Sequence, residues 1–185
     1  MKDRSLVQIA LYAAIFAVLG LLPRFDLPIA GGVPITAQSM GAMLAGVMLG
    51  GWRGALSIVL LLFVVALGAP LLAGGRGGLG VFFTPSVGFL FGWVAAAFVA
   101  GWIMQKLRKA PVFPAALVAS VVGGILVLYA FGIVGMAAMG NLTLKEAAIA
   151  CLVFIPGDTI KAVLVALIAQ TVARGMPEAL LSRNA

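Results

Sequence analysis

Apolar residues run through this chain in stretches that are too long and too continuous for a water-soluble domain. Hydrophobic residues occupy 64% of its 185 positions and charged residues only 9%, whereas a soluble domain carries about 25% charged residues to solvate its surface. The stretches do not alternate between polar and apolar residues at a period of two, which disfavours a membrane β-barrel. Because a bilayer offers backbone groups no water, such stretches fold as helices. The sequence therefore predicts an all-α integral membrane protein.

Glycine, proline and charged residues divide the chain into six predicted transmembrane helices, which we expect to form one compact bundle over residues 1–185. The predicted spans are Ser5–Leu22, Pro34–Gly50, Gly54–Leu67, Thr84–Gln105, Val112–Met139 and Leu144–Arg174. The basic residues before the first span resemble the start of a signal peptide. No small-residue cleavage site ends that span, so we expect it to remain as a helix. We expect no additional soluble domain.

The basic residues between the spans are unevenly distributed over the two sides of the membrane. One side has eight: Lys2, Arg4, Arg53, Lys106, Arg108, Lys109, Arg174 and Arg183. The other side has three: Arg24, Arg76 and Lys145. Cytoplasmic loops carry an excess of Lys and Arg, so both termini are predicted to be cytoplasmic. This scattered distribution also argues against a nucleic-acid partner, which would need a clustered basic face.

Asp158 and Lys161 are charged residues inside the last predicted span. Each charge near the middle of a membrane helix costs roughly 2.5–3.5 kcal/mol on insertion scales, and charges kept there usually have a function. Their spacing of three residues places both on one helix face. The pair either contacts a solute or forms a structural ion pair between helices, and the spacing alone leaves both interpretations open.

Pro156 stands just before this charged pair and removes one backbone hydrogen bond. We expect a kinked but continuous sixth helix, with Asp158 near the middle of the membrane. The alternative is a helix that restarts at Pro156, with Asp158 in its first turn nearer the outer side.

Two further segments on the predicted outer side offer polar groups. Gly74–Gly80 has five glycines in seven residues around Arg76, which indicates either a flexible external loop or the wall of a solute pocket. Thr36 and Gln38 enter the second predicted span from the same side. Their side chains can bond between helices or face a solute.

The residues that cofactors and catalysis require are scarce. The chain has no His and one Cys, Cys151, which makes a zinc or haem site improbable. The charged pair also lacks the second carboxylate, His or activated nucleophile that enzymatic catalysis would use. We therefore expect no metal, no cofactor and no enzymatic activity.

Small residues form two faces on the first predicted span. Ala10 and Ala14 make one small-xxx-small pattern, and Ala13 and Ala17 make another. Most such patterns pack helices within one protein. Two of them on one span can also dock another membrane protein.

Several of these segments, in this order along the chain, together resemble the BioY family. The segments are Val33–Gln38, Leu44–Gly50, Ala66–Pro70, Gly74–Gly78, Thr84–Gly92 and Pro156–Lys161. BioY proteins are the biotin-specific substrate-binding (S) components of energy-coupling factor (ECF) transporters. One motif departs from the family: Phe83–Phe89 reads Phe-Thr-Pro-Ser-Val-Gly-Phe where the family usually has Gly-Pro-Thr-Gly-Gly-Tyr.

The resemblance implies high-affinity capture of biotin, as a transported ligand, from the outer face of a bacterial inner membrane. It implies that Asp158 and Lys161 bind the substrate and that Arg76 borders it, with Thr36 and Gln38 as further candidates. It also implies that the alanine faces of the first span dock a transmembrane coupling subunit, with ATPase subunits supplying the energy. The alternative is an S component or small carrier for another vitamin-like solute.

Biotin has a ureido ring with two N–H donors and a carbonyl acceptor, a thioether ring and a valerate carboxylate. The Asp158 carboxylate suits the ureido N–H groups. Lys161 suits either the ureido carbonyl or the carboxylate, and Arg76 suits the carboxylate. The sequence does not decide which cation binds which oxygen.

Overall fold

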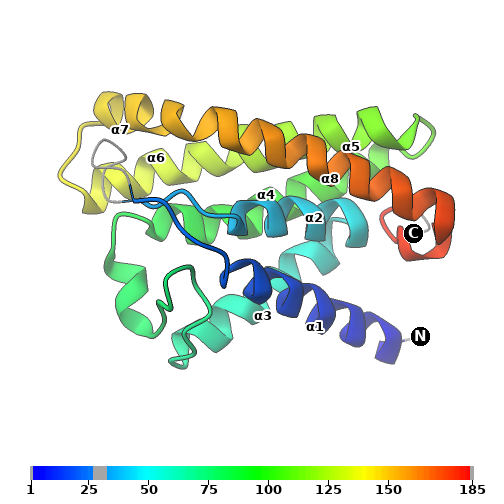
Figure 1. The fold of residues 1–185 in the computed structure, drawn as a ribbon, viewed down its shortest axis with the longest axis horizontal. Coiled ribbons are helices and arrows are strands. Elements are labelled where there is room, and N and C mark those ends of the chain that lie inside the picture. The colour runs from blue at the N-terminus through cyan, green and yellow to red at the C-terminus, as the bar shows by residue number, and fades with distance from the viewer. Residues whose placement is uncertain (1, 27–32, 184–185) are drawn as a thin grey trace.

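The computed structural model describes residues 2–26 and 33–183 as a bundle of helices (Figure 1). The α-helices are α1 (Lys2–Leu19), α2 (Gln38–Leu49), α3 (Gly51–Ala66), α4 (Val87–Lys106), α5 (Val112–Val121), α6 (Leu128–Met139), α7 (Leu144–Cys151) and α8 (Ile155–Gly175). A π-helical segment, Val122–Val127, joins α5 to α6, and a 3-10 turn, Leu152–Phe154, joins α7 to α8. Short 3-10 helices also occur at Leu79–Phe83 and Pro177–Ala179. Over these residues the chain forms six apolar helical segments, one for each predicted span, with some boundaries shifted by a few residues.

Three of these segments in the described part of the chain are long and apolar enough to cross a bilayer: Val87–Lys106, Val112–Met139 and Leu144–Gly175. The other three, Ser5–Leu19, Gln38–Leu49 and Gly51–Ala66, are shorter. At 1.5 Å per residue the 12 residues of α2 extend only about 18 Å. Extended chain before α2 therefore lies within the depth of the bundle.

The prediction that the second span begins at Pro34 is wrong, because α2 begins at Gln38. Phe25 and Ile35 exchange two backbone hydrogen bonds, of 3.0 and 2.9 Å, and this pairing holds the chain extended just before the helix. Thr36 therefore lies in extended chain instead of in the first helical turn. Its carbonyl group is not committed to a helix and is available to a side chain.

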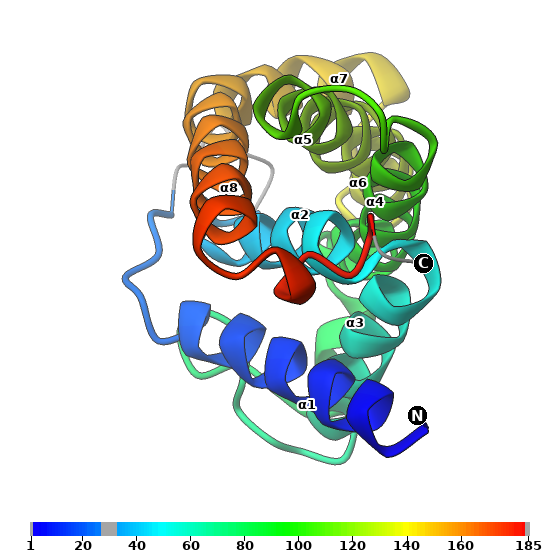
Figure 2. The ribbon, with the colours of Figure 1, turned by 90° about the vertical axis from the view of Figure 1, so that its right-hand side faces the viewer.

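Helix α2 forms the centre of the bundle. Eleven of its 12 residues are buried, and it packs against α1, α3, α4 and α8. Figure 2 shows α2 between α1 on one side and the layer that contains α5 and α8 on the other. Its small residues allow this close packing: a side chain at Gly46 would collide with the carbonyl oxygen of Ala97 on α4.

The last segment is helical throughout, from Leu144 to Gly175, as predicted for a continuous span. The 3-10 turn interrupts its α-helical pattern, and Pro156 lies in the first turn of α8, where a missing N–H group breaks no helical hydrogen bond. Asp158 is thus near the middle of the 32-residue segment and also in the first turn of α8. A helix N-terminus favours a carboxylate, so both sequence alternatives hold in part.

Both termini lie at one end of the bundle in Figure 1, and α7 lies at the other. The C-terminal strap, residues Pro177–Arg183, folds back across the end of the bundle that holds the termini. Ser182 donates its backbone N–H to the carbonyl oxygen of Met48 (3.0 Å), and Arg183 donates to that of Ala110 (2.7 Å). These contacts close the bundle at the end remote from α7.

Candidate functional site

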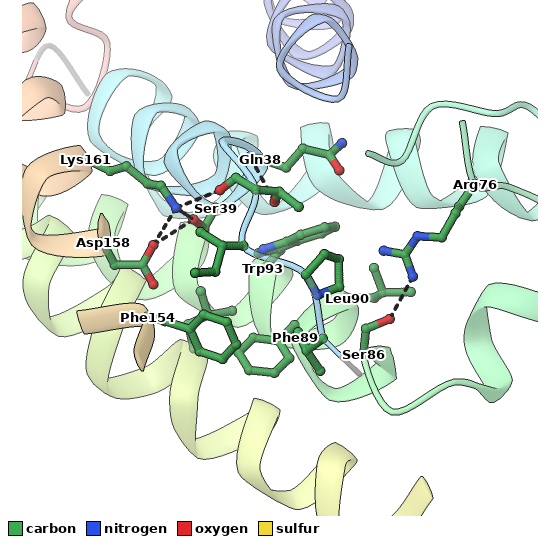
Figure 3. Close-up of a pocket in the computed structure, with 15 residues that line it drawn as sticks. Gln38, Ser39, Arg76, Ser86, Phe89, Leu90, Trp93, Phe154, Asp158 and Lys161 are labelled. Carbon is green, nitrogen blue, oxygen red and sulfur yellow. Dashed lines mark hydrogen bonds and ion pairs between the residues drawn. The ribbon is translucent and has the colours of Figure 1, made fainter. Parts of the chain in front are cut away.

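A cavity of about 50 Å³ lies where α2, α4 and α8 meet the extended segment before α2 and the Gly-rich loop. Figure 3 shows the residues around it. They are Val33, Pro34, Ile35, Thr36, Gln38, Ser39, Arg76, Ser86, Phe89, Leu90, Trp93, Leu128, Phe154, Asp158 and Lys161. Asp158, Lys161, Arg76, Thr36 and Gln38 all belong to this set, so the structure brings the five predicted substrate-binding residues together. The larger grooves on α3, α4 and α6 are lined by apolar residues and glycine.

One side of the cavity is formed by a polar cluster around Asp158 and Lys161. Lys161 Nζ lies 2.7 Å from Asp158 Oδ1, 2.9 Å from Ser39 Oγ and 2.6 Å from the carbonyl oxygen of Thr36. Ser39 Oγ donates to Asp158 Oδ1 at 3.0 Å, and Tyr129 donates its hydroxyl to Asp158 Oδ2 at 2.8 Å. The ion pair thus links α8 to the start of α2 and to α6.

The hydrogen-bond count in this cluster determines what it can offer a ligand. An ammonium group has three N–H donors, and Lys161 uses all three within the protein. A carboxylate has about four acceptor positions, and described residues occupy three of those of Asp158. Ser39 Oγ, with two lone pairs, accepts from Lys161 alone among the described residues. The cluster therefore presents acceptors to the cavity and no unused donor.

Arg76 lies on the opposite side of the cavity (Figure 3). A tight turn positions it: Leu72 and Arg76 exchange backbone hydrogen bonds of 3.0 and 3.1 Å, and Gly74 and Gly75 between them have φ angles of 78° and 70°, which favour glycine. The loop is therefore an ordered wall of the cavity. This agrees with one of the two interpretations that the sequence left open.

The guanidinium group of Arg76 is only partly used within the protein. It donates to Ser86 Oγ and to the carbonyl oxygen of Ala73, both at 3.3 Å, and its other N–H groups have no hydrogen bond to the described residues. Burial and the positive charge of Arg24 lower the pKa of Arg76, while Asp26 opposes this. An arginine nevertheless remains charged, so this side of the cavity presents donors and a positive charge.

Apolar side chains separate the two polar sides. Trp93 packs edge-on against Phe16, with ring centroids 4.9 Å apart, and Phe89 packs edge-on against Phe154 at 5.8 Å. Edge-to-face aromatic packing of this kind is stabilising. The cavity therefore has an acceptor side, an aromatic middle and a donor side.

Gln38 and Thr36, both predicted as substrate-binding candidates, use their side chains for hydrogen bonds within the protein. Gln38 donates from Nε2 to the carbonyl oxygen of Leu71 (3.0 Å) and accepts at Oε1 from the backbone N–H of Ala73 (2.8 Å). Its amide thus binds the Gly-rich loop to α2. The Thr36 hydroxyl accepts from the backbone N–H of Gln38 (3.3 Å), and it is the Thr36 carbonyl group that contacts Lys161.

The four alanines of α1 lie on different faces of that helix. Ala10 and Ala14 are exposed on the surface, Ala13 is buried at 7% exposure, and Ala17 packs against the core. The prediction that both alanine faces can meet a partner is therefore corrected. The face with Ala10 and Ala14 is exposed, whereas on the other face Ala13 is buried and Ala17 is partly buried.

Ser39 and Tyr129 both donate to the Asp158 carboxylate, and neither was predicted from the sequence as a site residue. Ser39 directly follows Gln38 in the first turn of α2. Its hydroxyl is a polar group in an apolar span, which could have marked it as a further site residue. Tyr129 gave no such signal, because its contact with Asp158 depends on how α6 packs against α8. Only the three-dimensional structure shows that contact.

A family model described as the BioY family matches residues 1–178. The chain belongs to the BioY family. It is 48% identical to the biotin transporter BioY of Rhodobacter capsulatus, over 98% of this chain and 100% of that one. It is 47% identical to the biotin transporter BioY of Rhizobium etli, over 96% and 97% of the two chains.

A solved structure of an S-component for biotin shares the fold. The crystal structure of the S-component for biotin from an ECF-type ABC transporter superposes with a TM-score of 0.86 at 32% identity, covering 94% of this chain and 92% of that one. The prediction of an all-α, six-helix membrane protein and the resemblance to the BioY family are therefore confirmed. The BioY relatives are named as transporters, and the chain belongs to a transporter family rather than an enzyme family.

Proposed function

We propose that this chain is a biotin-binding S component of an ECF-type transporter, in which the cavity binds biotin. The observation that carries the proposal is the division of the cavity into an acceptor side at Asp158 and a donor side at Arg76, with aromatic rings between them. Biotin has the matching order of groups, with N–H donors at one end, an apolar middle and a carboxylate at the other end. The names of the relatives support the same ligand.

The hydrogen-bond count supports one orientation of biotin over its reverse. Lys161 has no unused N–H group to donate to a ligand, so this side of the cavity can only accept hydrogen bonds. The ureido N–H groups of biotin would therefore lie here and donate to the remaining acceptor positions of Asp158 and Ser39. The valerate carboxylate would then lie near Arg76, whose planar N–H groups suit a carboxylate. The thioether ring and the valerate chain would pack between Trp93 and Phe154.

Binding would require the cavity to widen. Its volume is about 50 Å³, whereas pockets for small ligands measure about 300–1,000 Å³. The side chains between the two polar sides would therefore move apart as biotin enters. Affinity would then depend on this rearrangement as well as on the polar contacts.

The distribution of basic residues supports a position in the bacterial plasma membrane with both termini in the cytoplasm. The cavity lies toward the ends of α1 to α4 that are remote from the termini, so it would receive biotin from the outer face. The exposed surface of α1 around Ala10 and Ala14 would dock a transmembrane coupling subunit. ATPase subunits of the same assembly would supply the energy.

The decisive test is a direct measurement of biotin binding by the detergent-purified chain, for example by isothermal titration calorimetry. We expect saturable binding at sub-micromolar biotin. Binding should be lost in the Asp158→Asn/Lys161→Met double variant and kept in a Thr159→Ala control, because the exposed Thr159 lies outside the cavity. No binding by the parent chain at micromolar biotin would refute the proposal, and binding of another vitamin-like solute instead would favour the alternative S component.

A further inference from the structure

Tyr129 lies behind the cavity, where it contacts Asp158 but does not line the space for a ligand. Its hydroxyl donates to Asp158 Oδ2 at 2.8 Å, and its ring packs edge-on against Phe154 with centroids 6.4 Å apart. The side chain is buried at 8% exposure. A tyrosine hydroxyl this deep in an apolar bundle needs a hydrogen-bond partner, and the carboxylate of Asp158 supplies it.

The two oxygens of Asp158 have different environments. Oδ1 accepts from both Ser39 and Lys161, whereas Oδ2 accepts from Tyr129 alone among the described residues. The χ2 torsion of aspartate is broad, so its rotamer preference does not fix the plane of the carboxylate. Contacts on Oδ1 alone would leave that plane free to turn. The Tyr129 hydroxyl fixes it by holding the second oxygen.

The backbone around Tyr129 is built to place this hydroxyl. Helix α6 directly follows the π-helical segment Val122–Val127, and Tyr129 is its second residue. A π-turn contains an extra residue compared with an α-helical turn, which rotates the following helix face by about 100°. Tight packing holds this segment, because a side chain at Gly123 would collide with the carbonyl oxygen of Ala96 and one at Gly124 with Met43. Insertions of this kind are frequent at functional sites.

We propose that Tyr129 is a positioning residue that orients the Asp158 carboxylate toward a ligand N–H group, and that it thereby sets the preference of the cavity for ligands with such donors. The inference rests on the proposed function. It adds a residue that touches no ligand and acts only through Asp158.

The first test replaces Tyr129 with Phe, which removes the hydroxyl and keeps the ring against Phe154. We expect biotin to bind about tenfold more weakly, since hydrogen bonds to charged groups are among the strong ones. The chain's only other tyrosine is the matched control: Tyr12 is half-buried on α1 and lies outside the cavity. Tyr12→Phe should bind biotin as the parent does. Parental affinity in Tyr129→Phe would overturn the proposal.

A second measurement separates positioning from a general loss of packing. The infrared band of the Asp158 carboxylate can be assigned as the difference between parent and Asp158→Asn spectra. We expect this band to shift in Tyr129→Phe and to stay unchanged in Tyr12→Phe. An unshifted band, together with weaker binding, would make the role of Tyr129 purely structural and refute the proposal.

A double-mutant cycle completes the experiment. If Tyr129 acts through Asp158, Tyr129→Phe should weaken biotin binding by less than twofold when it is added to Asp158→Asn. The same tenfold loss in both backgrounds would contradict the inference. Failure of the parent chain to bind biotin would instead refute the proposed function, and the infrared band would still report whether the Tyr129 hydroxyl holds the carboxylate.

Discussion

Lys161 Nζ lies 2.7 Å from Asp158 Oδ1 and has no N–H group left for a ligand, because Ser39 and Thr36 accept the other two. The side chain of Lys161 is 15% exposed and that of Asp158 is 6% exposed. The two residues therefore act as one ion-paired unit. Lys161 stabilises the charge of the carboxylate and fixes its position, and Asp158 is the member of the pair that has an acceptor position open to a ligand.

Removing one charge of this pair should harm the fold more than removing both. A buried charge that loses its partner destabilises a protein by about 3–5 kcal/mol, whereas replacing both partners is often neutral. We expect Asp158→Asn and Lys161→Met each to lower the unfolding temperature in detergent. The Asp158→Asn/Lys161→Met double variant should recover most of the loss and still not bind biotin.

The result that would contradict this interpretation is a double variant that binds biotin normally. The pair would then be a structural contact between α8 and α2. The measurement needs both unfolding curves and biotin titrations on the same preparations, so that lost binding is not confused with lost structure.

Arg76 should determine how strongly the cavity prefers a free carboxylate. In the parent chain, biotin should bind at least tenfold more tightly than biotin methyl ester, because a bidentate contact with a guanidinium group is lost on esterification. In Arg76→Gln the two ligands should bind with similar affinity. Arg108→Gln is the matched control, since Arg108 is exposed at the end of the bundle near the termini. Unchanged discrimination in Arg76→Gln would place the carboxylate elsewhere.

Gln38 should act on binding through the Gly-rich loop. Replacing it with Met leaves the buried N–H group of Ala73 and the carbonyl group of Leu71 without their partner, and each unsatisfied group costs about 1–3 kcal/mol. We expect faster amide hydrogen exchange across residues 71–76 and weaker biotin binding. Exchange at the parental rate in this segment would mean that the turn between Leu72 and Arg76 holds the loop without Gln38.

The six helical segments could be predicted from the sequence because the membrane imposes their length and apolar character. The start of α2 could not, since the Phe25–Ile35 pairing that keeps Pro34 and Thr36 extended joins residues ten positions apart. The five binding candidates were found because charge and polarity are conspicuous in an apolar span. Which of them accept from a ligand, donate to it or hold the Gly-rich loop depends on the hydrogen bonds that they make in the folded protein, and the sequence does not show these.

The exposure of the α1 alanines likewise depends on the folded structure and not on the sequence pattern. A small-xxx-small pattern identifies residues that allow close packing, but not whether they pack inward or outward. Ala13 packs inward and Ala14, the next residue, lies on the surface. The sequence contains both patterns in equal strength, and only the packing of α1 against α2 and α3 separates them.

Ala14 and Ala13 therefore form a matched pair of positions for testing how the chain joins a coupling subunit. Ala14→Leu adds side chain to the exposed face, so we expect normal biotin affinity and stability but much less coupling subunit and ATPase in pull-down experiments. Ala13→Leu adds the same atoms to the core, where overpacking costs about 1–3 kcal/mol, so it should lower the unfolding temperature. If Ala14→Leu recovers the partner subunits in full, docking uses another surface than that of Ala10 and Ala14. If Ala13→Leu alone loses them at unchanged stability, the inward-facing alanines take part in docking and α1 must turn to expose them.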